Sequence, residues 1–545
     1  MPSRDLIADK LRRMKQPLLL QTDEYAPWSG GRGNDIWSMI TSSISGDLDT
    51  IKALVEKDPE LVHCSFEYLT PIRFAVRENQ QPIVEYLLAK GANPVIDFSD
   101  SLLTIAHDRG YTELETFLES QLYQLFHIRP EGDETADLIK AFDKQVVKDR
   151  LQKNPELLTA ADARGNQPIH WAVLTRQLEL VEWLLQKGAD VNAVRPDGAR
   201  PLDLTNGDYY YRSWYRDLPS TGLQKADVLS GYLIAKGADY DISAAAKLGD
   251  YDRVKELLSQ DSGLANRLPL HDGPYSGLPL RNAAAGGFIE IVKLLLDNGA
   301  DPNQREPGIA PWGASLHGAI SRRHWSIVML LLERGANANG HVESSGNCLW
   351  MAKHVGAPQE IIDALIAKGA RLSLELVCYD GDPAILQPML DAKPNLVFID
   401  EEHRDLLDHR ALVELALKYQ PALLKQFSIR NMNDPELAKW LIKNGLDPNN
   451  GDWLGRKPLH RAASEGNIEM AAVYVDAGAD INAIDTDISS TPLGWAARAG
   501  KKEMVEWLLE KGADASLPEE EQWARPVEWA KRKNYEEIKA VLGKY

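Results

Sequence analysis

The feature that most constrains this 545-residue chain is a short phrase that returns at a nearly fixed interval. The phrase is an apolar helical segment followed by Gly-Ala-Asp or a close variant, as at Asp190 and Asp301. Its glycines Gly445, Gly478 and Gly512 are separated by steps of 33 and 34 residues. A repeat of this length is typical of a solenoid, in which each unit packs against its neighbours. We therefore expect one elongated body rather than several compact domains.

A second phrase marks the start of a unit. It reads Pro-Ile-His-Trp-Ala over 168–172, Pro-Leu-His-Arg-Ala over 458–462 and Pro-Leu-Gly-Trp-Ala over 492–496. Proline suits the first helical position because the N–H that it lacks would have no partner there, and a preceding Thr can cap free N–H groups. The glycine that ends the unit supplies a left-handed helix cap. Each unit is thus predicted to contain two short helices.

These phrases resemble the Thr-Pro-Leu-His-x-Ala opening and the Gly-Ala-Asp ending of the ankyrin repeat family. The resemblance implies an all-α fold: a solenoid of helix-turn-helix units with short β-hairpin tips, wound into a curved superhelix. It also implies that hairpin tips and first helices line a concave groove, which is the usual ligand surface in that family. His170 and His460 match the family's His position, where the side chain normally bonds to the backbone between adjacent hairpins.

The domain organisation follows from where the repeat can be traced. We predict an N-terminal extension over 1–34 and a solenoid of roughly 15 to 16 units over 35–545. An aromatic insertion is expected at 205–224, because Gly188 and Gly237 lie 49 residues apart. Irregular repeats are expected over 373–431, where the consensus fades, and a capping repeat over 525–545.

Composition limits the classes of partner and cofactor. The chain carries 61 Lys and Arg against 80 Asp and Glu, a net charge of -19, which disfavours nucleic acid and anionic membrane surfaces as partners. Its three scattered cysteines indicate neither a disulfide framework nor a metal site. The acidic run at 401–409 suits a helix start without any metal, so no metal or other cofactor is expected. The polar N-terminus and the lack of long apolar stretches favour a cytoplasmic protein.

Candidate binding residues concentrate in the middle of the chain, where the hairpin tips at 268–275 and 305–312 are lengthened. There His, Arg and aromatic residues fall on the hairpins and first helices of consecutive predicted units. The candidates are His271, Asp272, Tyr275, Arg281, Trp312, His317, Arg322, Trp350 and His354, together with Tyr210 and Trp214 of the insertion. His317 occupies the same consensus slot as His170, which argues for a structural role.

Two functions compete for these residues. The first is an intracellular scaffold that binds a partner protein through its concave groove, because aromatic and arginine side chains supply most interface energy. The alternative is an enzyme or a binder of a sugar-like or carboxylated small molecule, with a His/Arg/Trp pocket on the central repeats. We expect a binding protein rather than an enzyme; an enzyme of this kind would be a hydrolase or lyase that uses His and Glu as acid and base. By family resemblance alone, an immunity or host-interaction factor is a third reading.

Overall fold

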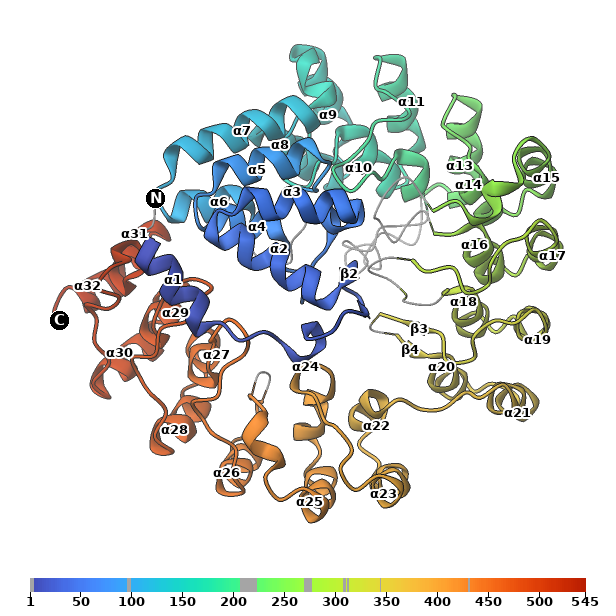
Figure 1. Ribbon diagram of the computed structural model, residues 1–545. Coiled ribbons are helices and arrows are strands. Elements are labelled where there is room, and N and C mark those ends of the chain that lie inside the picture. Colours follow the sequence, from blue (N-terminus) through green and yellow to red (C-terminus); the bar gives the residue numbers. More distant parts are fainter. Residues whose placement is uncertain are drawn as a thin grey trace.

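The computed structural model describes residues 4–95, 100–205, 223–268, 277–306, 310, 313–343, 345–429 and 432–545. Within these ranges nearly every element is a short helix, and the helices follow one another as antiparallel pairs (Figure 1). The expected all-α solenoid is therefore confirmed. Figure 1 shows the pairs following one another around a ring, with first helices on the inside and second helices on the outside from α14 to α30.

The elements have the following bounds. The first helices of the pairs are α2 (Gly33–Ser45), α4 (Pro71–Arg77), α6 (Leu102–Asp108), α8 (Pro130–Lys140), α10 (Pro168–Leu174), η4 (Pro201–Leu204), α14 (Ile242–Leu248), α16 (Pro279–Gly286), α18 (Ser315–Ser321), α20 (Cys348–His354), α22 (Leu374–Asp380), α24 (Asp400–His403) continued by η6 (Arg404–Asp408), α27 (Pro458–Glu465), α29 (Pro492–Arg498) and α31 (Pro526–Arg532). The second helices are α3 (Leu48–Lys57), α5 (Gln81–Ala89), α7 (Thr112–Phe126), α9 (Lys144–Lys153), α11 (Leu178–Gln186), α13 (Ala226–Ala235), α15 (Tyr251–Gln260), α17 (Ile289–Asp297), α19 (Trp325–Glu333), α21 (Gln359–Ala367), α23 (Pro383–Ala392), α25 (Arg410–Tyr419), α26 (Pro435–Lys443), α28 (Ile468–Asp476), α30 (Lys502–Glu510) and α32 (Glu536–Leu542). Outside the pairs lie α1 (Arg4–Arg13) and the 3-10 turns η1 (Leu18–Leu20), η2 (Pro59–His63), η3 (Pro155–Thr159), η5 (Ser262–Asn266), η7 (Leu423–Gln426) and η8 (Gln522–Ala524).

In the described part of the chain, two hairpins of very short strands lie at the tips. Strand β1 (Tyr25–Ala26) pairs antiparallel with β2 (Gly31–Arg32), and β3 (His341–Val342) pairs with β4 (Gly346–Asn347). The hairpins precede α2 and α20, so they position the first helices rather than build a sheet.

Local chemistry explains the helix pairs. In α10, Pro168 opens the helix, and the Gln167 N–H donates to Nδ1 of His170 at 3.0 Å. At the end of the second helix, Gly188 adopts φ 98°, a left-handed conformation that side chains disfavour, and its N–H donates to the Leu185 carbonyl. The phrases that predict the units are thus the helix starts and stops themselves.

Asparagine side chains hold successive units in register, which the sequence analysis did not predict. Asn192 donates to the Gly237 carbonyl at 3.1 Å and accepts from the Asp239 N–H at 2.8 Å. The same pair of bonds joins Asn303 to the Gly335 carbonyl and the Asn337 N–H. Further copies occur at Asn266, Asn339 and Asn449. Asn192, Asn303, Asn339 and Asn449 each follow one Gly-Ala-Asp-type ending and reach the next, whereas Asn266 follows an Asp-Ser-Gly-Leu ending. The unit spacing is therefore fixed by side-chain bonds as well as by packing.

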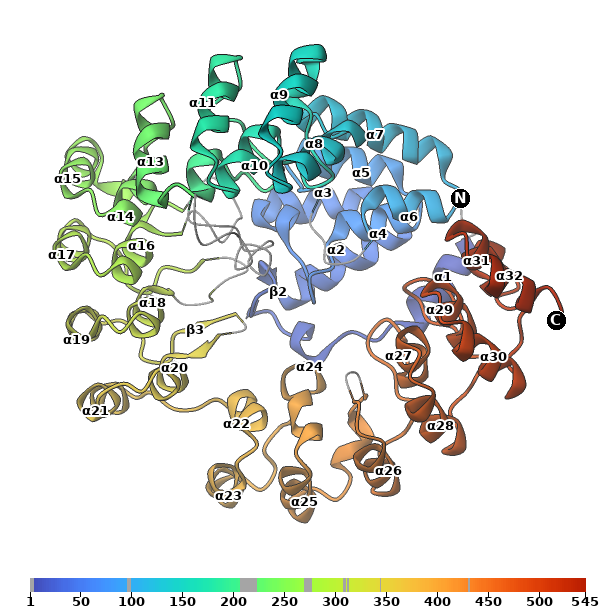
Figure 2. The ribbon, with the colours of Figure 1, turned by 180° about the vertical axis from the view of Figure 1, so that it is seen from behind.

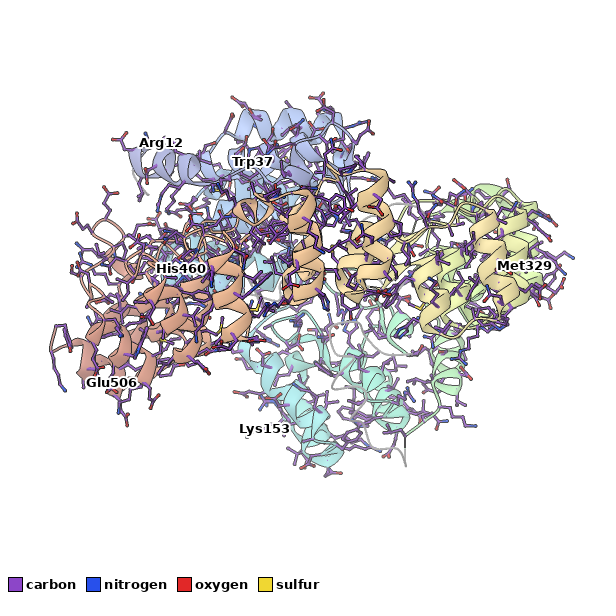
Figure 3. The ribbon with its side chains drawn as sticks, turned by 90° about the horizontal axis from the view of Figure 1, so that it is seen from below. Arg12, Trp37, Lys153, Met329, His460 and Glu506 are labelled. Carbon is purple, nitrogen blue, oxygen red and sulfur yellow. The ribbon has the colours of Figure 1, made fainter. Side chains whose placement is uncertain are left out.

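The ends of the solenoid meet, so the expectation of an elongated body is wrong. In Figures 1 and 2, α1 lies beside α29 and α31, at the opposite end of the chain. Lys10 of α1 is buried and pairs with Glu78 at 3.1 Å and with Glu521 at 2.7 Å. Seen from below, Arg12 and Trp37 lie on one side of the ring and Lys153 on the other, so the repeats also climb along its axis (Figure 3).

An apolar and a charged contact close the ring. Trp453, 3% exposed, packs edge-on against Phe66 and Phe74 with ring centroids 5.5 and 5.8 Å apart. Asp487 is also buried and pairs with Arg73 at 3.2 Å. One hydrophobic core therefore contains side chains from α2 to α7 together with Trp453.

Candidate partner-binding face

Six of the candidate residues lie outside the described part of the chain. They are His271, Asp272, Tyr275, Trp312, Tyr210 and Trp214, the last two within the aromatic insertion. The other five, Arg281, His317, Arg322, Trp350 and His354, fall on three neighbouring first helices, α16, α18 and α20, or at their ends.

Arg281 and His317 hold hairpins in place. Arg281 lies 3.0 Å from Glu306, a buried carboxyl at the bridge between Glu306 and Ala310. His317 is buried, and its Nε2–H donates to the Ser345 carbonyl of the next hairpin at 3.1 Å. Burial lowers the pKa of His317, so the ring is neutral at physiological pH.

The same bond recurs at two other units of the solenoid. His170 donates to the Ala193 carbonyl and His460 to the Ala483 carbonyl, both at 2.9 Å. These three histidines therefore connect adjacent hairpins, as the resemblance implied for His170 and His460.

Trp350 and His354 form the centre of an exposed aromatic cluster. Their rings stack in parallel on α20, with centroids 5.0 Å apart and planes 10° apart. On α22, Tyr379 meets the Trp350 ring edge-on at 6.0 Å and is 58% exposed. Asp380 accepts a hydrogen bond from Nε1 of Trp350 at 2.9 Å. We call Trp350, His354, Tyr379 and Asp380 the aromatic face.

Tyr379 and Asp380 were missed by the sequence analysis because the unit at α22 lacks the consensus. Aligning its cap Ser373 with Asn347 of α20 places Cys378 in the slot of Ala352. Tyr379 and Asp380 then align with Lys353 and His354, the two residues that follow this slot in α20. Arg322 lies at the C-cap of α18 and is exposed, away from these contacts.

Acidic side chains border the aromatic face. Glu375 lies one turn before Tyr379 in α22, and Glu402, Asp405 and Asp408 follow on α24 and η6. Burial, reinforced by Glu402 and Asp405, raises the pKa of Glu375 to about 7. Burial and Glu401 likewise raise the pKa of Glu402. We call Glu375, Glu402, Asp405 and Asp408 the acidic rim.

Residues of the first units contact two residues of the middle repeats, His341 and Arg305. Trp28 packs edge-on against His341 of β3 at 4.9 Å. Arg305 pairs with Glu60 at 2.7 Å and lies 3.6 Å from the centroid of the Tyr25 ring. Arg305 and His341 thus contact the chain's own first units, whereas the half-buried Trp350 and the exposed His354 and Tyr379 lie on the first helices α20 and α22.

Two observations on the described residues bear on metal and small-molecule binding. Across the described ranges, no group of three or more His, Cys, Asp or Glu is arranged to hold a metal ion. A cavity of about 160 Å³ lies between residues 15–18, 398–401 and 450–453. Pockets for drug-sized ligands usually reach about 300–1,000 Å³, so this cavity is smaller than most of them. No helix in the described residues has the length and apolar character needed to cross a membrane.

Comparison with known proteins agrees with the repeat architecture. A family described as ankyrin repeats (3 copies) matches residues 426–518, and one described as ankyrin repeat matches 67–98, 164–195 and 278–307. Among similar proteins, transient receptor potential cation channel subfamily A member 1 of Homo sapiens is 24% identical over 82% of this chain and 40% of its own length. E3 ubiquitin-protein ligase XB3 of Oryza sativa subsp. japonica is 37% identical over 18% of this chain and 21% of its own. Alpha-latrocrustotoxin-Lt1a of Latrodectus tredecimguttatus is 27% identical over 29% of this chain and 9% of its own length. The chain thus spans less than half the length of each of these relatives.

Proposed function

Because this chain is an ankyrin repeat protein, we propose that it binds a partner protein through the aromatic face on α20 and α22. Ankyrin repeats generally mediate protein–protein interaction. The proposal narrows that role to one surface of this ring, next to the hairpin residue His341 that contacts Trp28.

The observation that carries the proposal is the fixed geometry of Trp350. Its ring is stacked on His354 and its N–H is held by Asp380. Tryptophan and tyrosine dominate binding energy at interfaces, and side chains that are already ordered lose less entropy on binding. Tyr379 remains 58% exposed beside them, although burying an aromatic side chain is favourable.

Site-specific photo-crosslinking tests the proposal. Tyr379→p-benzoylphenylalanine is expected to capture one discrete protein in a lysate of the source cells. The matched control is Ile366→p-benzoylphenylalanine. Ile366 is 52% exposed on the second helix α21, which lies in the outer layer of the ring. Capture of the same proteins at both positions, or at Ile366 alone, would refute the aromatic face as the binding surface.

A further inference from the structure

The aromatic face and the acidic rim form one continuous surface. Glu375 and Tyr379 are one helical turn apart and share a side of α22. His409, which follows η6, is within hydrogen-bonding distance of the Tyr379 carbonyl, 3.1 Å from its Nε2. The carboxylates of Glu375, Glu402 and Asp405 are close enough to influence one another. A segment bound across α20, α22 and η6 therefore meets aromatic rings and carboxylates together.

The negative charge of the acidic rim has few positive side chains near it in the described residues. In the described residues its ion-pair contacts are with His341, 3.8 Å from Glu375, and with His403, 3.9 Å from Glu402. Burial lowers the pKa of both histidines to about 4, so both are neutral at pH 7. The nearest arginine on the same element, Arg404, pairs with Glu67 at 3.0 Å. On α20, Lys353 is exposed and adds one positive charge to the helix that carries Trp350.

We propose that the partner segment bound by this surface is basic, with an arginine or lysine cation placed against Tyr379 and Trp350 and beside Asp380 and the acidic rim. This inference rests on the proposed function and names the chemistry of the partner. Cations are attracted to the faces of tryptophan and tyrosine, and arginine can also pair with carboxylates through two parallel hydrogen bonds. A nucleic acid or an anionic lipid surface is disfavoured by the same carboxylates.

The physical reason for the pairing is that the rim carboxylates repel one another in the free protein. A cation placed between them removes that repulsion and favours the ionised form of Glu375. Binding is therefore expected to release protons at neutral pH. Isothermal titration in two buffers of different ionisation enthalpy measures this release directly, and Glu375→Gln is expected to abolish most of it.

Fluorescence anisotropy with labelled hexa-arginine, hexalysine and hexaglutamate tests the charge assignment on the full chain. We expect hexa-arginine to bind more tightly than hexalysine, and hexaglutamate not to bind. Asp405→Asn and Tyr379→Ala are each expected to weaken hexa-arginine binding about 5-fold to 10-fold, the usual range for a significant interface side chain. Both side chains are on the surface, so circular dichroism should show unchanged folding.

The control separates the local effect from the overall negative charge. Asp363→Asn makes the same charge change at an exposed residue of α21, a helix in the outer layer of the ring. Equal weakening by Asp363→Asn and Asp405→Asn, or no effect of Tyr379→Ala, would overturn the inference. A protein captured at Tyr379 through a segment without lysine or arginine would leave the proposed function intact and overturn only the basic character of the partner.

Discussion

Replacing Asp487 by asparagine should open the ring without unfolding its repeats. Asp487 is 5% exposed and lies in the hairpin before α29, whereas its partner Arg73 is in α4. Its carboxylate is also 3.6 Å from Arg456, and its backbone carbonyl accepts a hydrogen bond from Arg109. Although burial disfavours ionisation, these guanidinium groups lower the pKa of Asp487, so the native side chain is charged.

The size of the effect can be worked from the contact. Two unit charges 3.2 Å apart attract by about 5 kcal/mol at an effective dielectric constant of 20. Breaking a buried pair by removing one partner costs about 3–5 kcal/mol, because the other charge stays buried. At 1.36 kcal/mol per factor of ten, Asp487→Asn should shift the closing equilibrium by roughly 150-fold to 5,000-fold. The loss affects closure, since Arg73 and Asp487 belong to opposite ends of the solenoid.

Hydrogen exchange measures this shift directly. The Lys15 N–H donates to the Trp453 carbonyl at 3.3 Å, a bond that exists only when the ends meet. Its exchange should accelerate by the factor given above, and small-angle X-ray scattering should show a larger radius of gyration. Asp297→Asn, which breaks an exposed pair with Arg334, should cost under about 1 kcal/mol. Unchanged Lys15 exchange in Asp487→Asn would show that this ion pair does not hold the ring closed.

Three further predictions concern the fold. Burial, and then Arg195, lowers the pKa of His170 to about 3, so the unfolded chain binds a proton near pH 6.5 that the native chain does not bind. Between pH 7.5 and pH 5 this residue alone should cost about 2 kcal/mol of stability, so urea titrations should show an acid loss about 2 kcal/mol smaller in His170→Gln than in the parent chain. A Cβ at Gly132 would lie 2.0 Å from the Ala161 carbonyl oxygen, so Gly132→Ala should lower the stability by about 1–3 kcal/mol or more. Gly231 in α13 has open space around it, so Gly231→Ala should raise the stability by about 0.5–1 kcal/mol. Thermal melts measure both changes. Trp453→Ala should cost about 3–5 kcal/mol and accelerate exchange in the N-terminal repeats, because the indole is buried among their aromatic side chains.

Each of these has an outcome that would contradict it. The histidine argument is wrong if His170→Gln loses as much stability in acid as the parent chain. Equal effects of the two glycine substitutions would show that contact with neighbouring backbone does not decide them. Unchanged hydrogen exchange at both ends of the chain in Trp453→Ala would show that the apolar contact of Trp453 does not help to close the ring.

The candidate site was accessible from sequence only in part. In a recognisable unit, Trp350 lies two residues before Ala352 and His354 two residues after it, and the structure stacks their rings. Tyr379 was hidden because Cys378 replaces the expected alanine in its unit. The consensus slot of His317 already indicated its bond to a backbone carbonyl, whereas only the coordinates reveal that Arg281 pairs with Glu306.

The sequence by itself determined the unit. Helix starts at proline, left-handed caps at glycine and apolar faces at helical spacing act within about one repeat length, so they can be read from neighbouring residues. The tertiary structure alone decided that the ends of the solenoid meet. Closure arises from small rotations between successive units, added over the whole chain, and from pairs such as Arg73 and Asp487 that are 414 residues apart. No local sequence pattern predicts such a pair, because burying either charge is favourable only when the curvature of the solenoid places its partner next to it.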